Sequence, residues 1–461
     1  MKDRILQTLH DLRRYAREKG YEVSLFFHVE DSYLMRFANS AISLNTNEHL
    51  IRFEATAYDG RKRASYEMIT NLDDVEALKT GIDTAAEMVE HAMPLTYEPT
   101  IPVLPETFID ESNWDAELAS VSNEERLAYF NTAVKGLETE EIRLSGIFSN
   151  GTNVLAHTNT RSEHAQYFQT SDAQITAVLS HERLKWEVSA GQSAQRKTDL
   201  DPQALRAELA FLVKHYREDP PQQLPLGNYD IVFGPAATAD LVRIMNWIGF
   251  NGGMMKRGYS FLKEEEVGRQ VLSPLFTLTD DPTRRETFPF RRDFTGIERK
   301  PFPLFERGVF KGFIWSQDEA DEFGAQPTGH TVMHNSLVMA GGEMAVDSLE
   351  ELVAQRREND LLYVPFLHYM NIVNPSQGVV TASSRFGALL LKADGSIAIP
   401  YNVRLTHSLK TIFGENLAWL SRKTVPHNTS SSYGARNPTA VIVPRFLCVN
   451  DLAISHSNDS F

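Results

Sequence analysis

The chain has 461 residues, 42% of them hydrophobic and 23% charged, a composition typical of a globular protein that buries large cores. Its length exceeds that of one ordinary domain and predicts roughly two to four. Acidic residues outnumber basic ones by 61 to 46, giving a formal net charge of −15. That balance argues against nucleic acid or an anionic membrane as a main partner, because both bind clustered lysine and arginine.

Cysteine content and hydropathy indicate the compartment. The single cysteine, Cys448, excludes an intramolecular disulfide framework and fits a reducing environment. The N-terminal segment mixes charged residues with apolar ones, unlike the continuous apolar core of a signal peptide. No stretch reaches the ~20 uninterrupted apolar residues of a transmembrane helix. We therefore expect a cytoplasmic protein.

The N-terminal region predicts two helices around a set of strands. Apolar residues recur at helical spacing over residues 5–16 and again over residues 72–91. Asp59-Gly60 is typical of a hairpin turn. The strands between the two helices are expected at residues 22–29, 33–44, 50–58 and 63–69.

Further along, a proline-rich loop over residues 94–105 leads to a helix expected at residues 123–137. Residues 142–189 alternate in polarity and predict an antiparallel meander with a turn at Gly151 and a solvated polar face. Another helix is expected at residues 201–216, where Asp-Pro is a good start signal.

The segment 218–225, rich in proline and polar residues, is the best linker in the chain. We place a domain boundary there, which gives an α+β fold of two domains, 1–224 with the meander and a β-rich 225–461. The second domain opens with a strand at 229–233 and a helix at 236–248. Glycine-punctuated strands follow, with hairpin turns expected at residues 306–308 and 393–395.

Common catalytic motifs are absent from the sequence: there is no G-x-S-x-G, no G-x-x-x-x-G-K-[ST], no G-x-G-x-x-G and no C-x-x-C. Cys448 lies in the apolar run 441–449, which favours a core strand over a nucleophile. Asp280-Asp281-Pro282 could bind a cation with its paired carboxylates. Aspartate also bonds its own backbone in turns, so we interpret this segment as a turn.

Two histidines, His330 and His334, are the one candidate for metal chemistry. On a helix, their spacing would place both rings on the same face. The preceding segment, 326–329, favours a loop, and no glutamate lies between the histidines to activate a water. We interpret them as loop or interface histidines.

The second half carries an ordered series of short patterns that resembles the TldD/PmbA family of zinc proteases. No single pattern is specific, but their order and spacing are. The patterns lie at residues 229–235, 252–253, 256–262, 267–268, 278–282, 292–296, 308–310, 320–324, 326–329, 334–335, 402–405 and 437–439.

In the active subunit of that family, the helix after the first strand carries H-E-x-x-x-H. Its histidines hold zinc, its glutamate activates a water, and a later cysteine completes the ligand set. Aligned on Lys256-Arg257-Gly258, these positions hold Arg243, Ile244 and Ile248 here, and residues 420–433 contain no cysteine. Arginine cannot lose its proton to bind a metal, and isoleucine has no donor atom. The resemblance is therefore to the TldE/PmbA branch, whose members look like metal-free partners of the zinc-bearing subunit, and it implies no cofactor.

The resemblance implies a non-catalytic subunit that pairs with a zinc-bearing TldD-like paralogue and helps enclose a chamber where unfolded peptides are cut. Extended substrate could add as a strand to an exposed sheet edge. The alternative is a homodimeric peptide-binding or regulatory module without a protease partner, and a third hypothesis is an enzyme that uses His330 and His334. The family's label as modulator of DNA gyrase we attribute to indirect effects, because the acidic charge gives no reason to expect contact with DNA.

His330, His334 and Asn335 are the candidate substrate or interface residues. We expect no membrane partner and no nucleic acid, and a homodimer could form in an isolated sample. The helix at 236–248 should pack an apolar stripe against the core or a partner. This stripe comprises Leu241, Ile244, Met245 and Ile248.

Overall fold

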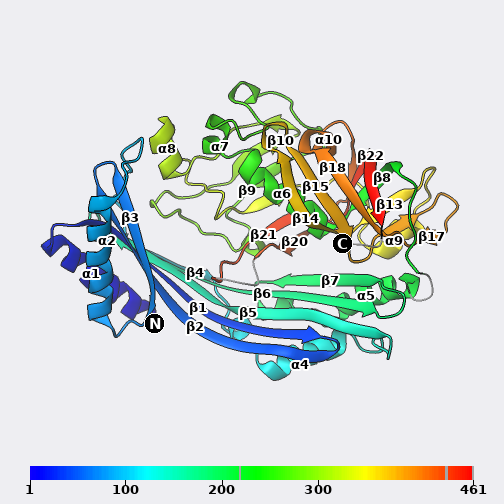
Figure 1. Ribbon diagram of the computed structural model, residues 1–461, viewed down its shortest axis with the longest axis horizontal. Helices are drawn as coiled ribbons and strands as arrows, with labels where there is room; N and C mark the ends of the chain where they lie inside the picture. The colour runs from blue at the N-terminus through cyan, green and yellow to red at the C-terminus, as the bar shows by residue number, and fades with distance from the viewer. Residues whose placement is uncertain (217–219, 431–434, 459–461) are drawn as a thin grey trace.

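The computed structural model describes residues 1–216, 220–430 and 435–458. Their strands form three sheets, one in the N-terminal half and two in the C-terminal half. Figure 1 shows the N-terminal sheet as a long curved layer below the C-terminal half. Helices combined with mainly antiparallel sheets confirm the α+β class and the β-rich C-terminal half.

The N-terminal sheet has seven strands in the order β3-β2-β1-β5-β6, and both β4 and β7 lie along the outer edge of β6. The β4–β6 pair is parallel and the other pairs are antiparallel. The strands are β1 (Glu22–Ala38), β2 (Ala41–Asp59), β3 (Lys62–Thr70), β4 (Phe108–Asn113), β5 (Ile142–Asn159), β6 (Ala165–His181) and β7 (Glu187–Ala194).

Helices α1 (Lys2–Glu18) and α2 (Val75–His91) pack against the first strands of this sheet. The predicted apolar stripe of α1, from Ile5 to Ala16, is buried. That of α2 is buried except at its first residue, Val75, which is 41% exposed, and at the half-buried Ala86. Asp74 caps α2 by accepting a hydrogen bond of 3.1 Å from the amide of Ala77, which satisfies an N–H that has no partner within the helix.

The strands predicted between residues 22 and 58 were wrong in number, because three expected runs form two long strands. β1 continues without a break through Asp31-Ser32, polar residues that interrupt the apolar pattern. The chain reverses at Asn39-Ser40, whose φ angles are 51° and 61°. Asparagine tolerates this left-handed region better than most residues, so the turn had a local signal.

Gly151 is not a turn, contrary to the prediction, but lies in the middle of β5 between β1 and β6. A Cβ at this position would lie 2.0 Å from the carbonyl oxygen of Asp31 and 3.1 Å from the guanidinium of Arg436. Glycine is needed here because neighbouring groups approach the backbone closely.

Contrary to the prediction, a large part of the meander's polar face is buried and not solvated. Every residue of β5 from Asn150 to Asn159 is buried. Asn153 and Gln166 are 1% and 0% exposed, and Gln166 lies beside Gly296 of the C-terminal half. In this part of the meander, the polar residues therefore contact the rest of the protein and not water.

Three further helices complete the N-terminal half. Ser122 and Glu125 form a capping box that starts the second of them, so its N-terminal amides are satisfied locally. The third packs against the second and against β7. The helices are α3 (Ala116–Ala119), α4 (Asn123–Ala133) and α5 (Pro202–Tyr216).

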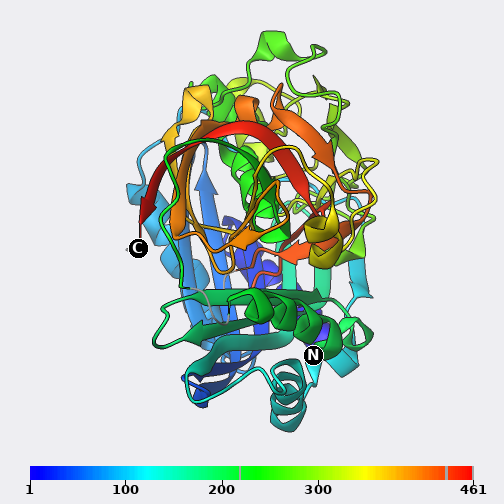
Figure 2. The ribbon, with the colours of Figure 1, turned by 90° about the vertical axis from the view of Figure 1, so that its right-hand side faces the viewer.

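One C-terminal sheet has nine strands in the order β14-β15-β18-β22-β8-β13-β16-β17, with β19 also paired to β22. Figure 2 shows the C-terminal strands, in orange and red, curving over the N-terminal sheet. The strands are β8 (Gly227–Phe233), β13 (Leu361–Val364), β14 (Phe366–Asn374), β15 (Val379–Arg385), β16 (Leu389–Leu391), β17 (Ile397–Ala398), β18 (Asn402–Ser408), β19 (Leu417–Leu420) and β22 (Leu447–Asn458).

The other C-terminal sheet has six strands in the order β11-β10-β9-β12-β21-β20. They are β9 (Leu278–Asp280), β10 (Phe302–Glu306), β11 (Val309–Phe310), β12 (Leu337–Met339), β20 (Thr424–Asn428) and β21 (Ala440–Pro444). The C-terminal helices are α6 (Pro235–Ile248), α7 (Gly252–Lys256), α8 (Gln317–Phe323), α9 (Leu349–Ala354) and α10 (Leu409–Phe413).

The predicted hairpin turns are confirmed at all three places, where they join β2 to β3, β10 to β11 and β16 to β17. The apolar run 441–449 is not one strand, however, because β21 ends at Pro444 and β22 begins at Leu447 in a different sheet. Cys448 is 2% exposed. Burial raises the pKa of its thiol to about 12, so it stays a neutral core residue.

The two halves share a core although each sheet lies on one side of residue 224. Leu209 and Leu212 of α5 belong to the same apolar cluster as Leu352 and Tyr363. The division into domains 1–224 and 225–461 therefore remains a prediction. In the described residues, no helix is long and apolar enough to cross a membrane.

Candidate functional site at helix α6 and the seam

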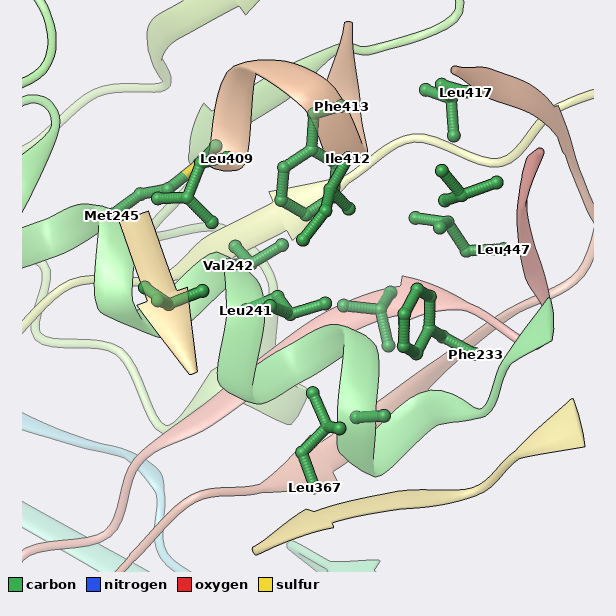
Figure 3. Packing of buried hydrophobic residues seen from close by; sticks show 14 of the residues in the cluster. Phe233, Leu241, Val242, Met245, Leu367, Leu409, Ile412, Phe413, Leu417 and Leu447 are labelled. Carbon is green, nitrogen blue, oxygen red and sulfur yellow. The ribbon is translucent and has the colours of Figure 1, made fainter. Parts of the chain in front are cut away.

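Helix α6 follows strand β8 directly and begins with Pro235 in its first turn, where proline costs no hydrogen bond. Leu241, Val242 and Met245 are buried and point into the core toward helix α10 (Figure 3). The side of the helix that carries these residues therefore packs against the C-terminal core and does not face solvent.

The opposite side of α6 is more open. The side chain of Arg243 is 50% exposed, and its Nε lies 3.6 Å from a carboxylate oxygen of Asp240. Burial raises the pKa of Asp240 to about 6, although Arg243 opposes the shift. Trp247 is 40% exposed, Ile244 is half-buried and Ile248 is 1% exposed. The expected apolar stripe is therefore buried except at Ile244.

His330 lies in the predicted loop, and its ring is 2% exposed. Its Nδ1 lies 2.6 Å from Oδ2 of the fully buried Asp280. The other oxygen of Asp280, Oδ1, accepts a 2.8 Å bond from Arg299 and a 2.7 Å bond from the amide of Ser336. Burial alone would raise the pKa of Asp280, but Arg299, His330 and Ser336 together hold it below its usual value. Asp280 thus fixes the loop that carries His330 to the end of strand β9.

The interpretation of Asp280-Asp281-Pro282 as a turn holds for only one of the two aspartates. Asp281 accepts bonds from the amide and hydroxyl of Thr283 at 2.9 and 2.6 Å, as a turn aspartate does. Asp280, one residue earlier, ends strand β9 and belongs to the buried ion-pair network. No local pattern indicates that role, because the partners of Asp280 are distant along the chain.

His334 and Asn335 lie between this loop and α6. The ring of His334 makes edge contacts with Phe290 and Phe294, at centroid distances of 5.2 and 5.1 Å. Burial lowers the pKa of His334 to about 4, so the ring is neutral at physiological pH. Nδ2 of Asn335 donates to Oδ1 of Asn246 at 2.6 Å, which ties the loop to the helix.

Arg436 links the C-terminal half to the N-terminal sheet and is 8% exposed. Its Nε donates to Oδ1 of Asp172 at 2.7 Å, and a terminal nitrogen donates to the hydroxyl of Ser149 at 3.3 Å. The Arg436 amide donates to a carboxylate oxygen of Glu30. Asp172 and Glu30 are 3% and 1% exposed. We call Glu30, Asp172 and Arg436 the seam.

Two neighbours complete the seam. Arg52 donates to the other oxygen of Glu30 at 2.8 Å. His28 Nε2 lies 2.9 Å from the carbonyl oxygen of Arg436, which only accepts, so this nitrogen carries the proton. Burial lowers the pKa of His28. None of the seam residues was predicted as functional.

A cavity of about 840 Å³ opens between β7, β20 and the N-terminus of α6. Its β7 wall runs from Ser189 to Ser193 and, apart from Gln192, consists of small residues, which leave the backbone accessible. The facing wall includes Val425 and His427 of β20. Both strands are sheet edges, since β7 pairs with β6 and β20 with β21. We call this space the groove.

Comparison with known proteins agrees with this architecture. Residues 226–456, half of the chain, match the PmbA/TldA metallopeptidase C-terminal domain. The chain belongs to the PmbA/TldD family. It is also 25% identical over 148 residues to a protein named Metalloprotease from Methanothermobacter thermautotrophicus, a match that covers 30% of this chain and 32% of that protein. The chain therefore aligns with about a third of the length of this curated relative.

Solved structures of other proteins share the whole fold. TldE from Thermococcus kodakarensis superposes with a TM-score of 0.81 at 16% identity, covering 97% of this chain and 100% of that one. A putative modulator of DNA gyrase from Bacteroides thetaiotaomicron gives 0.75 at 17% identity, covering 97% and 98%. One from Thermotoga maritima gives 0.71 at 16% identity, covering 97% and 99%. At these identities the likeness concerns the fold.

The residues of this PmbA/TldD chain at the expected zinc positions do not fit the ion. Arg243 is an exposed cation, Ile244 is at the rim of the helix face, and Ile248 is in the core. In the part of the chain that the structure describes, no group of three or more His, Cys, Asp or Glu gathers where a metal could bind.

Proposed function

We propose that this chain is a non-catalytic subunit of a TldD/TldE-type protease, in which a zinc-bearing TldD-like paralogue cuts unfolded peptides. The observation that carries the proposal is the face of α6, where Arg243, Ile244 and Ile248 replace the family's H-E-x-x-x-H. A catalytic zinc site needs three protein ligands and an activated water, and these side chains supply neither. Cys448 is a free, buried cysteine, and free thiols persist in a reducing compartment. We therefore propose that the protein acts in the cytoplasm.

The groove supports a role in holding peptide. An extended peptide can pair with the free edge of β7 through main-chain hydrogen bonds, which do not depend on sequence. The small side chains of Ser189 and Gly191 allow such an approach, and the cavity has the volume for several residues. An unfolded peptide can pair with this edge along its whole length, because none of its backbone groups is already engaged in secondary structure.

His334 and Asn335 are the proposed interface residues next to α6. The Asn335–Asn246 bond fixes the loop relative to the helix. Exposed Trp247 and Met333, 40% and 54% accessible, lie on these same segments. A partner chain that covers them removes apolar surface from water, which stabilises the pair.

A cleavage assay on an unfolded peptide tests the proposal, with each subunit alone and with the two mixed. We expect no cleavage by this chain alone, cleavage after mixing with the paralogue, and no stoichiometric zinc in this chain by elemental analysis. Cleavage by this chain alone that is lost in His330→Ala or His334→Ala would refute the proposal. No gain on mixing would instead favour the homodimeric module.

The groove is tested by filling it. Ser189→Trp should block the β7 edge and weaken binding of a fluorescent unfolded peptide, measured by anisotropy. Ser145→Trp is the matched control, because Ser145 is a half-buried serine of the same sheet that does not line the groove. Equal peptide affinity in both variants would remove the groove from the proposal.

A further inference from the structure

Part of the groove is lined by three phenylalanines from different segments of the chain. Phe211 belongs to α5, Phe366 begins β14, and Phe386 lies between β15 and β16. The ring centroids of Phe366 and Phe386 are 5.5 Å apart. Helix α5 passes beside them, because a Cβ at Gly387 would lie 3.5 Å from Leu212. We call Phe211, Phe366 and Phe386 the aromatic corner.

The protein does not cover the rings of the aromatic corner completely. Each of the three residues is half-buried, whereas core phenylalanines such as Phe233 and Phe250 are 1% and 0% exposed. All three residues of the corner line the groove. An apolar group bound there would therefore remove apolar surface from water on both sides of the contact.

Phe386 is held at this place in an unusual backbone conformation. Its φ angle is 60°, in the left-handed region that bulky residues rarely adopt. Such residues persist where the surrounding structure fixes them, and they gather at ligand sites. The guanidinium of Arg385 lies 4.4 Å from the centroid of the Phe386 ring and donates to a carboxylate oxygen of Glu187 at 3.2 Å. Because Glu187 is the first residue of β7, this ion pair fixes the ring beside the strand that forms the groove wall.

The charges of the groove disfavour an acidic ligand. Arg385 and Glu187 compensate one another beside the aromatic corner. Elsewhere the lining has five carboxylate side chains and three cationic ones. They are Asp199, Glu208, Glu286, Asp347 and Glu350 against Arg285, Lys423 and Arg445. The groove is therefore net negative, which favours a neutral or basic peptide over an acidic one.

We propose that the aromatic corner is a side-chain subsite of the groove, which takes one large apolar side chain of a neutral or basic unfolded peptide. The inference rests on the proposed function, because the main chain of the peptide is held along β7. Alternate side chains of an extended peptide point to the same face. One of them can enter the corner while the main chain stays on the edge, since a single cavity of about 840 Å³ joins the two.

The subsite gives the groove a selectivity that main-chain pairing lacks. Large apolar side chains are mostly buried in folded proteins, and unfolding exposes them. A subsite for such side chains therefore recognises a segment because it is unfolded, whatever the rest of its sequence.

Fluorescence anisotropy with three labelled peptides tests the proposal on the full chain. The peptides are unfolded and identical except at a central position, which holds phenylalanine, alanine or glutamate, and the rest of each peptide is uncharged. We expect the phenylalanine peptide to bind about tenfold more tightly than the alanine peptide, because the larger side chain buries more apolar surface. The glutamate peptide should bind most weakly.

Two variants remove the subsite by different routes. Ala207 is an exposed residue of α5 that lines the groove one helical turn before Phe211, so Ala207→Trp fills the space beside that ring. Phe386→Gly removes a ring of the corner and suits the positive φ. Each should reduce the preference for the phenylalanine peptide to about twofold or less and leave the affinity for the alanine peptide unchanged. Ala128→Trp is the matched control, because Ala128 is an exposed alanine of α4 that does not line the groove.

The outcomes separate the subsite from the groove. Equal binding of the phenylalanine and alanine peptides by the wild-type chain, with both weakened by Ser189→Trp, overturns the subsite and leaves the groove in place. A tenfold preference that survives in Ala207→Trp also overturns the subsite. If the wild-type chain binds none of the peptides, or if Ser189→Trp does not weaken binding, the groove is refuted and the subsite with it.

Discussion

Removing the cation of the seam is the sharpest test of how the two halves are joined. Arg436→Met keeps much of the side-chain volume but leaves the carboxylate of Asp172, 3% exposed, without its partner. Breaking a buried ion pair from one side costs about 3–5 kcal/mol. We expect a loss of this size in the free energy of unfolding at neutral pH, measured by urea denaturation.

The pH dependence of this loss has a defined sign. Burial raises the pKa of Asp172 above its usual 3.8 even with Arg436 present, so the folded state binds a proton more readily than the unfolded state. Without Arg436 the pKa rises further. The variant therefore loses most stability at neutral pH. The loss shrinks as the pH falls through the raised folded-state pKa of Asp172, because the buried carboxylate then takes up a proton and no longer needs a cation.

Two further variants make the test decisive. Adding Asp172→Asn to Arg436→Met removes the orphaned charge and should recover at least half of the loss. Arg183→Met removes an arginine whose Nε lies 2.9 Å from Glu141 in an exposed pair, and should lower the free energy of unfolding far less, because water screens exposed pairs. A loss for Arg436→Met as small as that of Arg183→Met, or no recovery in the double variant, would refute the reasoning.

Three other predictions concern packing and titration. Leu241→Ala, in the core, should lower the free energy of unfolding by about 2–5 kcal/mol. Ile244→Ala, at a half-buried position, should lower it by about 1 kcal/mol. Equal losses for the two variants in urea denaturation would contradict the orientation of α6. Gly151→Ala should prevent normal folding, judged by circular dichroism and yield, whereas Gly312→Ala should be tolerated because its Cβ would come no closer than 3.9 Å to other atoms. His157, whose pKa burial lowers to about 4, should show no NMR titration near its usual 6.5. Because the unfolded chain binds that proton at higher pH, stability should fall as the pH drops from 6.5 to 4, and His157→Gln should reduce this fall.

Local features of the fold were predictable from the sequence. The turns at Asp59-Gly60 and Asp394-Gly395 depend on residues that adopt positive φ at low cost, and the structure has them where expected. The stripes of α1 and α2 follow from helical periodicity alone. Asp31-Ser32, in contrast, broke the apolar pattern of β1, although tertiary contacts keep that strand continuous.

The candidate site was predictable only in part. Alignment with the family's zinc motif identified the positions of Arg243, Ile244 and Ile248. The glycine and proline of residues 326–329 predicted the loop around His330. The roles of Asp280 and Arg436 depend on partners far along the chain, such as Asp172, which is 264 residues from Arg436. A single sequence holds no local signal for such pairs, because neither residue differs from an ordinary surface charge until the fold brings them together.

The bond between Glu30 and Arg436 spans 406 residues, nearly the whole length of the chain. A ribosome makes the N-terminal sheet first, so the carboxylates of Glu30 and Asp172 emerge long before their cation and stay hydrated while synthesis continues. Burial of these two carboxylates waits until Arg436 has been translated. A chain cut short before Arg436 lacks the charge that lets these carboxylates be buried. Native burial of the seam therefore requires translation past Arg436, which leaves chains terminated before that residue open to proteolysis.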